Sequence, residues 1–229
     1  MLKAGLLDVD VTLFRPGPQL GAEGYRRIGA RHGLELDPAR YDEARLAALD
    51  DLQHHPELAH DEELWIRFTE DIVRGMGGDD EGSHACATAV VREWERHENF
   101  FLYDDTLPTL EVLRAHGLKL ALVSNGQRDL EAFARHHGLD VDVCVGSMRH
   151  GRVKPHRSIF EAALAAVDAR PDEAAMVGDS YADDVEGARA LGMRAILLDR
   201  DGLHEGEEDR IDTLLALPAA LGLELQVSD

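Results

Sequence analysis

The chain of 229 residues is strongly acidic, since 45 aspartate and glutamate residues outweigh 24 lysine and arginine residues and give a formal net charge of −21. A charge of that sign repels phosphate backbones and anionic lipids, which argues against binding to nucleic acid or to a membrane surface. The hydrophobic share of 44% is that of a globular protein, and the length suffices for one large domain or for a domain with an insertion.

The first predicted element is a buried strand at residues 2–7, which leads directly into Asp8 and Asp10. Two carboxylates this close repel each other, and burying either of them without compensation is costly. Such a pair at the end of a core strand does nothing for folding by itself. It indicates a bound divalent cation or a proton-transfer task.

Residues 15–99 are predicted to be a helical insertion. Four segments in this range carry apolar residues at helical spacing, namely 25–32, 41–52, 62–76 and 85–97. The domain around the insertion is predicted to consist of residues 1–14 and 100–229. One polar stretch of the insertion is expected to face solvent and not to bind metal; it holds His54, His55 and His60.

From residue 102 onward, helical and strand-like segments alternate. Residues 106–116 have apolar side chains at helical spacing and are followed by Gly117, a typical helix-ending residue. The later segments are, in order, strand 118–123, helix 128–137, strand 141–145, helix 158–167, strand 174–177, helix 185–191 and strand 195–198. Because the strands are apolar throughout, the pattern predicts an α/β fold with a Rossmann-like parallel sheet and helices on both faces.

Polar residues follow four of these strands. They are Asp8, Asp10 and Thr12 after the first, Ser124, Asn125 and Gly126 after the second, Lys154 beyond the third, and Asp179, Asp183 and Asp184 after the fourth. In an open parallel sheet, ligands bind at the edge where the carboxyl ends of the strands meet. Carboxylates at that edge indicate a hard cation with oxygen ligands, Mg²⁺. The lysine and the hydroxyl groups suit a phosphoryl group bound beside it.

The order and spacing of these residues resemble the haloacid dehalogenase superfamily of aspartyl-phosphate phosphohydrolases. Its Asp-x-Asp-x-Thr motif matches residues 8–12, and its hydroxyl residue after a strand matches Ser124. Its Lys-Pro pair matches Lys154-Pro155, and its Gly-Asp motif with a further Asp matches residues 178–184. Each motif alone is weak, but four in order at strand ends form a specific pattern. The helical insertion is similar to the cap domain that follows the first motif in this superfamily.

The resemblance implies a catalytic mechanism. Asp8 would attack phosphorus and form an aspartyl-phosphate. Asp10 would protonate the leaving alkoxide and then deprotonate the attacking water. Lys154 would offset the charge of the transferring group. Mg²⁺ would be held by Asp8, by Asp179 and by the backbone carbonyl of Asp10.

The resemblance also implies binding roles. The phosphate oxygens would be held by Thr12, Ser124, Asn125 and Gly126. Either Asp183 or Asp184 would steady a metal-bound water or Lys154, and the sequence leaves open which of them does so. Val11 stands where many members carry glycine, a change that the broader motif accepts. The sequence also leaves open whether Arg15 or the predicted turn at residues 75–83 contacts a substrate.

The expected function is a Mg²⁺-dependent phosphatase for a small phosphorylated metabolite, because a closing cap excludes bulky macromolecules. A phosphomutase uses the same nucleophile but keeps water from the phosphoenzyme, and the sequence does not separate the two. A dehalogenase is disfavoured because such members lack the acid found here as Asp10. A non-catalytic scaffold is disfavoured because no motif residue is missing.

Several features of the sequence indicate the cellular compartment in which the protein is expected. No apolar stretch approaches the roughly 20 residues that span a bilayer, and the N-terminus leads into a strand and not into a secretory signal. Cys86 and Cys144 lie outside any CxxC pattern, which is typical of buried, unpaired cysteines. We expect a cytoplasmic protein without nucleic-acid or membrane partners, and the sequence leaves its oligomeric state open.

Overall fold

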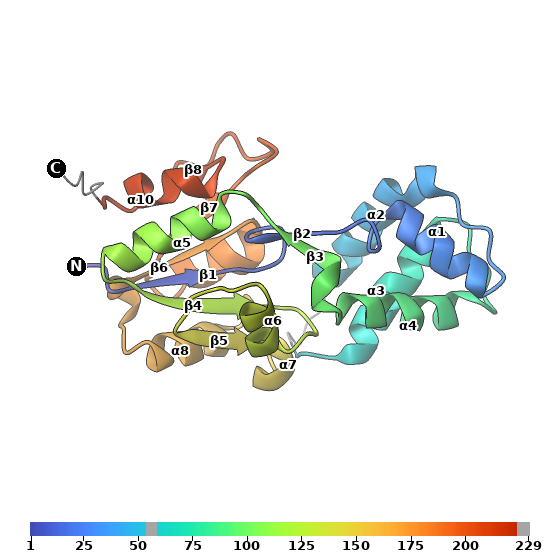
Figure 1. Ribbon diagram of the computed structural model, residues 1–229, viewed down its shortest axis with the longest axis horizontal. Coiled ribbons are helices and arrows are strands. Elements are labelled where there is room, and N and C mark those ends of the chain that lie inside the picture. Colours follow the sequence, from blue (N-terminus) through green and yellow to red (C-terminus); the bar gives the residue numbers. More distant parts are fainter. Residues whose placement is uncertain (54–58, 224–229) are drawn as a thin grey trace. The chain divides into compact units, whose positions relative to one another are not determined.

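The computed structural model describes residues 1–53 and 59–223 (Figure 1). The chain divides into two compact units, an α/β unit of Met1–Arg15 with Leu102–Asp229 and a helical unit of Pro16–Phe101. His54 and His55 lie outside the described residues. Among the described helices, none combines the length and the apolar character needed to cross a bilayer.

The α/β unit is built on a six-stranded parallel sheet with the strand order β5-β4-β1-β6-β7-β8. Its strands are β1 (Ala4–Leu7), β4 (Lys119–Ser124), β5 (Val143–Gly146), β6 (Ala174–Gly178), β7 (Arg194–Leu198) and β8 (Arg210–Ile211). In the register of the sheet, Leu7 lies between Leu122 and Val177. The chain runs outward from β1 on one side and returns to β6 on the other. This change of direction makes the carboxyl end of β1 the expected ligand site.

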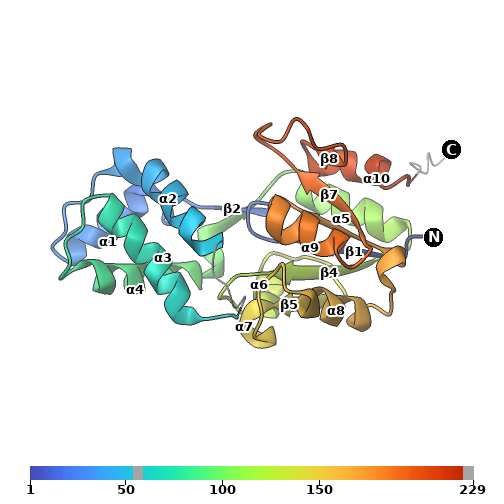
Figure 2. The same cartoon turned by 180° about the vertical axis from the view of Figure 1, so that it is seen from behind.

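Helices cover both faces of the sheet. They are α5 (Thr106–Ala115), α6 (Leu130–His136), α7 (Ser147–His150), α8 (Arg157–Ala166), the π-helical η4 (Tyr181–Glu186), α9 (Gly187–Arg189) and α10 (Leu217–Ala220). Figures 1 and 2 show α5 and α10 on one face and α8 and α9 on the other. Phe160 of α8 and Ala188 of α9 join Leu6 of β1 in one buried apolar cluster. The predicted α/β fold class is confirmed.

The last predicted helix begins earlier than the sequence indicated. The sequence predicts a helix over residues 185–191, but the helical turns begin at Tyr181 with η4. The Ser180 hydroxyl accepts a hydrogen bond from the Asp183 N–H at 3.2 Å, and the Asp184 carboxylate accepts one from the Ser180 N–H at 3.1 Å. The first bond satisfies one of the N–H groups at the start of the helix, and the second satisfies the N–H of the capping residue Ser180, so this polar segment becomes helical.

The helical unit has a core of its own. Its helices are α1 (Ala22–Arg31), α2 (Tyr41–Gln53), α3 (Glu62–Gly75) and α4 (Ser83–Trp94). Tyr25, Ile72 and Val90, from three different helices, are fully or almost fully buried in one cluster.

Two short strands that the sequence did not indicate, β2 (Phe14–Pro16) and β3 (Phe100–Leu102), pair with each other. Three residues are too few to show a periodicity of two.

The two cysteines are shielded from solvent wholly or in part, whereas Arg15 is exposed. Cys86 is buried in the core of the helical unit, Cys144 is half-buried in β5, and both are free thiols. Burial raises the pKa of each thiol to about 11, which keeps both protonated and unreactive at neutral pH. Arg15 is exposed and lies three residues after the first motif, in the short strand β2.

Asp199 organises the turn that follows β7. Its buried carboxylate accepts hydrogen bonds from the backbone N–H groups of Leu203 at 2.8 Å and His204 at 2.9 Å, and from Arg210 at 2.9 Å. Burial alone would raise the pKa of Asp199, but these three donors lower it from 3.8 to about 2.

The hydrogen bonds that lower the pKa of Asp199 stabilise the fold only while its carboxyl group is charged. We expect Asp199→Asn to reduce the free energy of unfolding at about pH 6, and the difference from wild type to shrink as the pH falls through 3.8 toward 2. Urea unfolding at several pH values measures the difference. The matched control is Asp201→Asn, which replaces an exposed neighbour. A difference that does not change with pH would contradict the expectation.

Candidate active site

The first motif lies in a tight loop at the end of β1. The Asp8 N–H donates to the Val177 carbonyl at 2.8 Å, which extends the pairing of β1 with β6 as far as the aspartate. Val11 has a φ of 64°, in the left-handed region that a β-branched residue rarely adopts. Glycine suits this position because it has no Cβ. The loop thereby turns the chain directly after Asp10 and brings Thr12 back into the interior, where it is fully buried.

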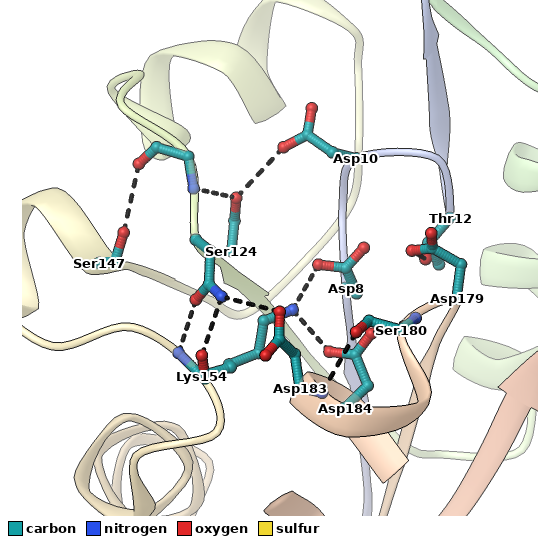
Figure 3. A network of polar contacts seen from close by, with 12 residues as sticks. Asp8, Asp10, Thr12, Ser124, Ser147, Lys154, Asp179, Ser180, Asp183 and Asp184 are labelled. Atoms are coloured by element: carbon teal, nitrogen blue, oxygen red, sulfur yellow. Dashed lines mark hydrogen bonds and ion pairs between the residues drawn. The ribbon is translucent and has the colours of Figure 1, made fainter. Parts of the chain in front are cut away.

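Lys154 connects the first and fourth motifs. Its Nζ lies 2.5 Å from Asp8 Oδ1 and 2.7 Å from Asp184 Oδ1, and all three side chains are buried (Figure 3). Burial alone would lower the pKa of Lys154, but Asp184 and Asp8 raise it above its ordinary value. Lys154 is therefore a permanent cation between two carboxylates. Buried charges are tolerated only when they are paired in this way.

Three carboxylates converge beside this lysine. Asp8, Asp179 and Asp184 each place an oxygen within 4.8 Å of the others. Burial raises the pKa of Asp8, and burial together with the charges of Asp8 and Asp184 raises the pKa of Asp179. One ammonium group offsets only one of three carboxylate charges. The cluster therefore fits a divalent cation with oxygen ligands, which would balance the remaining two.

Gly178 makes room for the fourth motif. A Cβ at this position would lie 2.0 Å from Asp184 Oδ2, so no side chain fits between β6 and that carboxylate. Besides its contact with Lys154, Asp184 accepts a hydrogen bond from the Ser180 N–H at 3.1 Å. The glycine of the motif is thus needed to hold Asp184 against the strand end.

Asn125 ties the second motif to the third. Its Oδ1 accepts from the Lys154 N–H at 2.6 Å, and its Nδ2 donates to the Lys154 carbonyl at 3.1 Å. The same Nδ2 lies 3.5 Å from Asp183 Oδ2. Asp184 thus contacts the Lys154 ammonium group, whereas Asp183 contacts the amide that holds the Lys154 backbone. The role of Asn125 in phosphate binding stays a prediction.

The hydroxyl groups of the first and second motifs contact other site residues. Thr12 Oγ1 donates to Asp179 Oδ1 at 3.1 Å. Ser124 Oγ accepts from the Gly126 N–H at 3.0 Å and lies 3.5 Å from Asp10 Oδ2. Figure 3 shows these groups around the carboxylates and Lys154. The structure therefore gathers the predicted site residues at one edge of the sheet, and their roles stay predictions.

Asp10 is predicted to bind the metal through its backbone carbonyl and not through its carboxylate. Its carboxylate is not part of the cluster among the described residues, because it lies with Ser124 and Arg128 instead. The predicted ligand was the backbone carbonyl, which these side-chain contacts do not test.

Arg128 and Ser147 are among the residues that contact the site and that the motifs do not indicate. Arg128 Nη2 donates to Asp10 Oδ1 at 2.7 Å, and Ser147 Oγ donates to the Gly126 carbonyl at 3.4 Å. The sequence predicts a helix over residues 128–137, but α6 begins at Leu130, so Arg128 precedes the helix. The only sequence signal was its position four residues after Ser124.

Comparisons with known proteins show which family this chain resembles over most of its length. The family model of haloacid dehalogenase-like hydrolases matches residues 2–192. A phosphoserine phosphatase of Thermus thermophilus is 31% identical over 229 residues, which covers 87% of this chain and 89% of the relative. A glyceraldehyde 3-phosphate phosphatase of Methanopyrus kandleri is 31% identical over 223 residues, with coverages of 93% and 90%.

A solved structure shows the same fold. The crystal structure of a HAD phosphatase from Thermococcus onnurineus superimposes with a TM-score of 0.67 and 27% sequence identity, covering 97% of this chain and 99% of that one. The predicted family and the predicted enzyme class are confirmed by these matches. On its motifs, its fold and its relatives, the chain belongs to the haloacid dehalogenase-like hydrolase family.

Proposed function

We propose that this protein is a Mg²⁺-dependent phosphatase that hydrolyses a small phosphorylated metabolite through an aspartyl-phosphate on Asp8. The observation that carries the proposal is the group of three carboxylates around one buried ammonium at the end of β1. The names of two relatives, a phosphoserine phosphatase and a glyceraldehyde 3-phosphate phosphatase, support a small phosphomonoester as substrate.

In the first step, a carboxylate oxygen of Asp8 bonds to phosphorus while the bond from phosphorus to the ester oxygen breaks. Asp10 gives its proton to the departing alkoxide. In the second step, Asp10 takes a proton from water, which attacks phosphorus and releases phosphate and free Asp8. Lys154, fixed 2.5 Å from Asp8, offsets negative charge on the phosphoryl group in both steps.

The residues around Asp8 fit the remaining needs of this reaction. Asp8, Asp179 and the carbonyl of Asp10 would hold the metal, and Asp184 lies in the same cluster. Bound Mg²⁺ would reduce the repulsion between the Asp8 carboxylate and a phosphate dianion. The proposed phosphate-binding residues are Thr12, Ser124, Asn125 and Gly126.

Phosphate release from a panel of small phosphomonoesters, with and without Mg²⁺, tests the proposed activity. We expect turnover that requires the metal and yields free phosphate. Transfer of the phosphoryl group to a second position of the same sugar, without free phosphate, would indicate a phosphomutase instead. Absence of turnover on every ester would contradict the proposal. The cytoplasmic location stays a prediction.

Metal binding has a readout that does not depend on activity. Because a ligand that binds only the folded state stabilises it by about 2.7 kcal/mol at a hundred times its Kd, we expect Mg²⁺ to raise the Tm of the wild type. Asp179→Asn should abolish most of this rise, because it removes one of three clustered carboxylates. The exposed Asp104 provides the control, Asp104→Asn, which should respond like wild type. An equal rise in all three proteins would contradict the assigned site.

A further inference from the structure

Arg128 is a buried arginine that contacts Asp10, the proposed acid and base. Its side chain is 3% exposed, whereas that of Asp10 is 34% exposed, and Nη2 lies 2.7 Å from Asp10 Oδ1. The guanidinium carbon lies 4.7 Å from the centre of the Phe133 ring, which supports it from α6 by a cation–π contact. A side chain packed in this way has little freedom, so it offers Asp10 a fixed donor.

The other oxygen of Asp10 faces the second motif. Asp10 Oδ2 lies 3.5 Å from Ser124 Oγ. A Cβ at Gly126 would lie 3.2 Å from Ser124 Oγ, 3.4 Å from Asp10 Oδ2 and 3.8 Å from the Arg128 guanidinium carbon. Because Gly126 has no side chain, there is space for Asp10 to contact both Ser124 and Arg128. The segment from Ser124 to Arg128 therefore holds both oxygens of the Asp10 carboxyl group.

These contacts make the two oxygens of Asp10 unequal. A guanidinium group only donates hydrogen bonds and stays charged, so Asp10 Oδ1 must remain an acceptor while Arg128 is bound to it. Oδ2 is then the oxygen available to carry a proton. A hydroxyl such as Ser124 Oγ is compatible with either state of Oδ2, because it can both donate and accept.

We propose that Arg128 is a positioning residue that fixes the Asp10 carboxyl group so that Oδ2 exchanges protons with the reacting oxygens. The inference rests on the proposed phosphatase function and goes beyond it by assigning a role to a residue outside the four motifs. When the bond from phosphorus to the ester oxygen breaks, the proton on Oδ2 moves to that ester oxygen. Oδ1 stays bound to Arg128 throughout.

A pair of aryl esters tests this role. Phenyl phosphate has a leaving group that needs a proton, whereas the leaving group of 2,4-dinitrophenyl phosphate departs without one. General acid catalysis contributes about 10²–10⁴-fold, so we expect Arg128→Met to lower the ratio of kcat/KM for phenyl phosphate to that for 2,4-dinitrophenyl phosphate at least about tenfold. Both esters are measured on the same preparation, so a partly folded variant changes both values equally and leaves the ratio intact.

Two further variants separate positioning from a general structural effect. Arg149→Met removes another arginine paired with an aspartate, Asp129 at 2.8 Å, and should leave the ratio of the two esters unchanged. In an Asp10→Asn background, Arg128→Met should cause no further change in the ratio, because Arg128 acts through that carboxyl group.

The outcomes separate the two proposals. If wild type hydrolyses both esters and Arg128→Met leaves the ratio unchanged, the role of Arg128 is overturned while the phosphatase proposal stands. The role of Arg128 is also overturned if its substitution lowers the ratio equally with and without the Asp10 carboxyl group. If wild type hydrolyses neither these esters nor the metabolite panel, both proposals fail.

Discussion

Replacing Asp8 by asparagine is expected to lower kcat by about 10⁴-fold or more, the scale on which enzymes respond to loss of a nucleophile. The amide has the size of the carboxyl group but is a poor nucleophile toward phosphorus. Phosphate release in the presence of Mg²⁺ measures the loss. The substitution also removes one of three clustered charges, and burial raises the pKa of Asp8 in the folded protein. We therefore expect the Tm without metal to be unchanged or higher.

This combination distinguishes a lost nucleophile from a damaged fold. Asp104→Asn, at an exposed position, serves as the control and should keep wild-type activity. Activity of Asp8→Asn within tenfold of wild type would exclude Asp8 as the nucleophile. A large fall in both activity and Tm would show that Asp8 has a structural role that the charge argument does not include.

The largest loss of stability is expected for Lys154→Met. The substitution leaves Asp8 and Asp184 buried without the ammonium group that contacts both. Removing one partner of a buried ion pair costs about 3–5 kcal/mol, and we expect a loss of that size in the free energy of unfolding. Urea unfolding in the presence of a chelator measures it without a contribution from bound metal. Activity should fall as well, because the transferring group loses its positive neighbour.

Lys119 offers a matched control for this experiment. It also pairs with an aspartate, Asp142 at 3.1 Å, but its side chain is 59% exposed. Exposed pairs contribute about 0.2–1 kcal/mol, so Lys119→Met should be far milder than Lys154→Met. Equal losses in the two variants would contradict the assignment of Lys154 to a buried charge cluster.

The core of the α/β unit could be predicted from local patterns. Strand β1 (Ala4–Leu7) is buried along its whole length, and a strand covered on both faces has to be apolar throughout. The end of the helix at residues 106–116 could also be predicted, from the glycine that follows it. Gly117 has a φ of 78°, a conformation that glycine adopts without strain and most residues avoid. Shorter elements such as β2 and β3 could not be predicted, because they contain too few residues for a pattern.

The residues of the candidate site could be predicted as a group but not in their contacts. A parallel sheet brings its strand ends to one edge, so the position of Asp8 and Asp179 after apolar strands was enough to place them together. The different contacts of Asp183 and Asp184 could not be read in advance. Adjacent residues in a helical turn point in different directions, and the turn itself began earlier than the sequence indicated.

The sequence by itself determined the alternation of the longer strands and helices, the family and the acids that follow the strands, because these follow from local periodicity and from motifs of a few residues. Only the tertiary structure decided which charges meet. Lys154 contacts Asp8 across 146 positions of the chain, and Arg128 contacts Asp10 across 118. Such pairs depend on the packing of several elements at once, and no local pattern in the sequence records that packing.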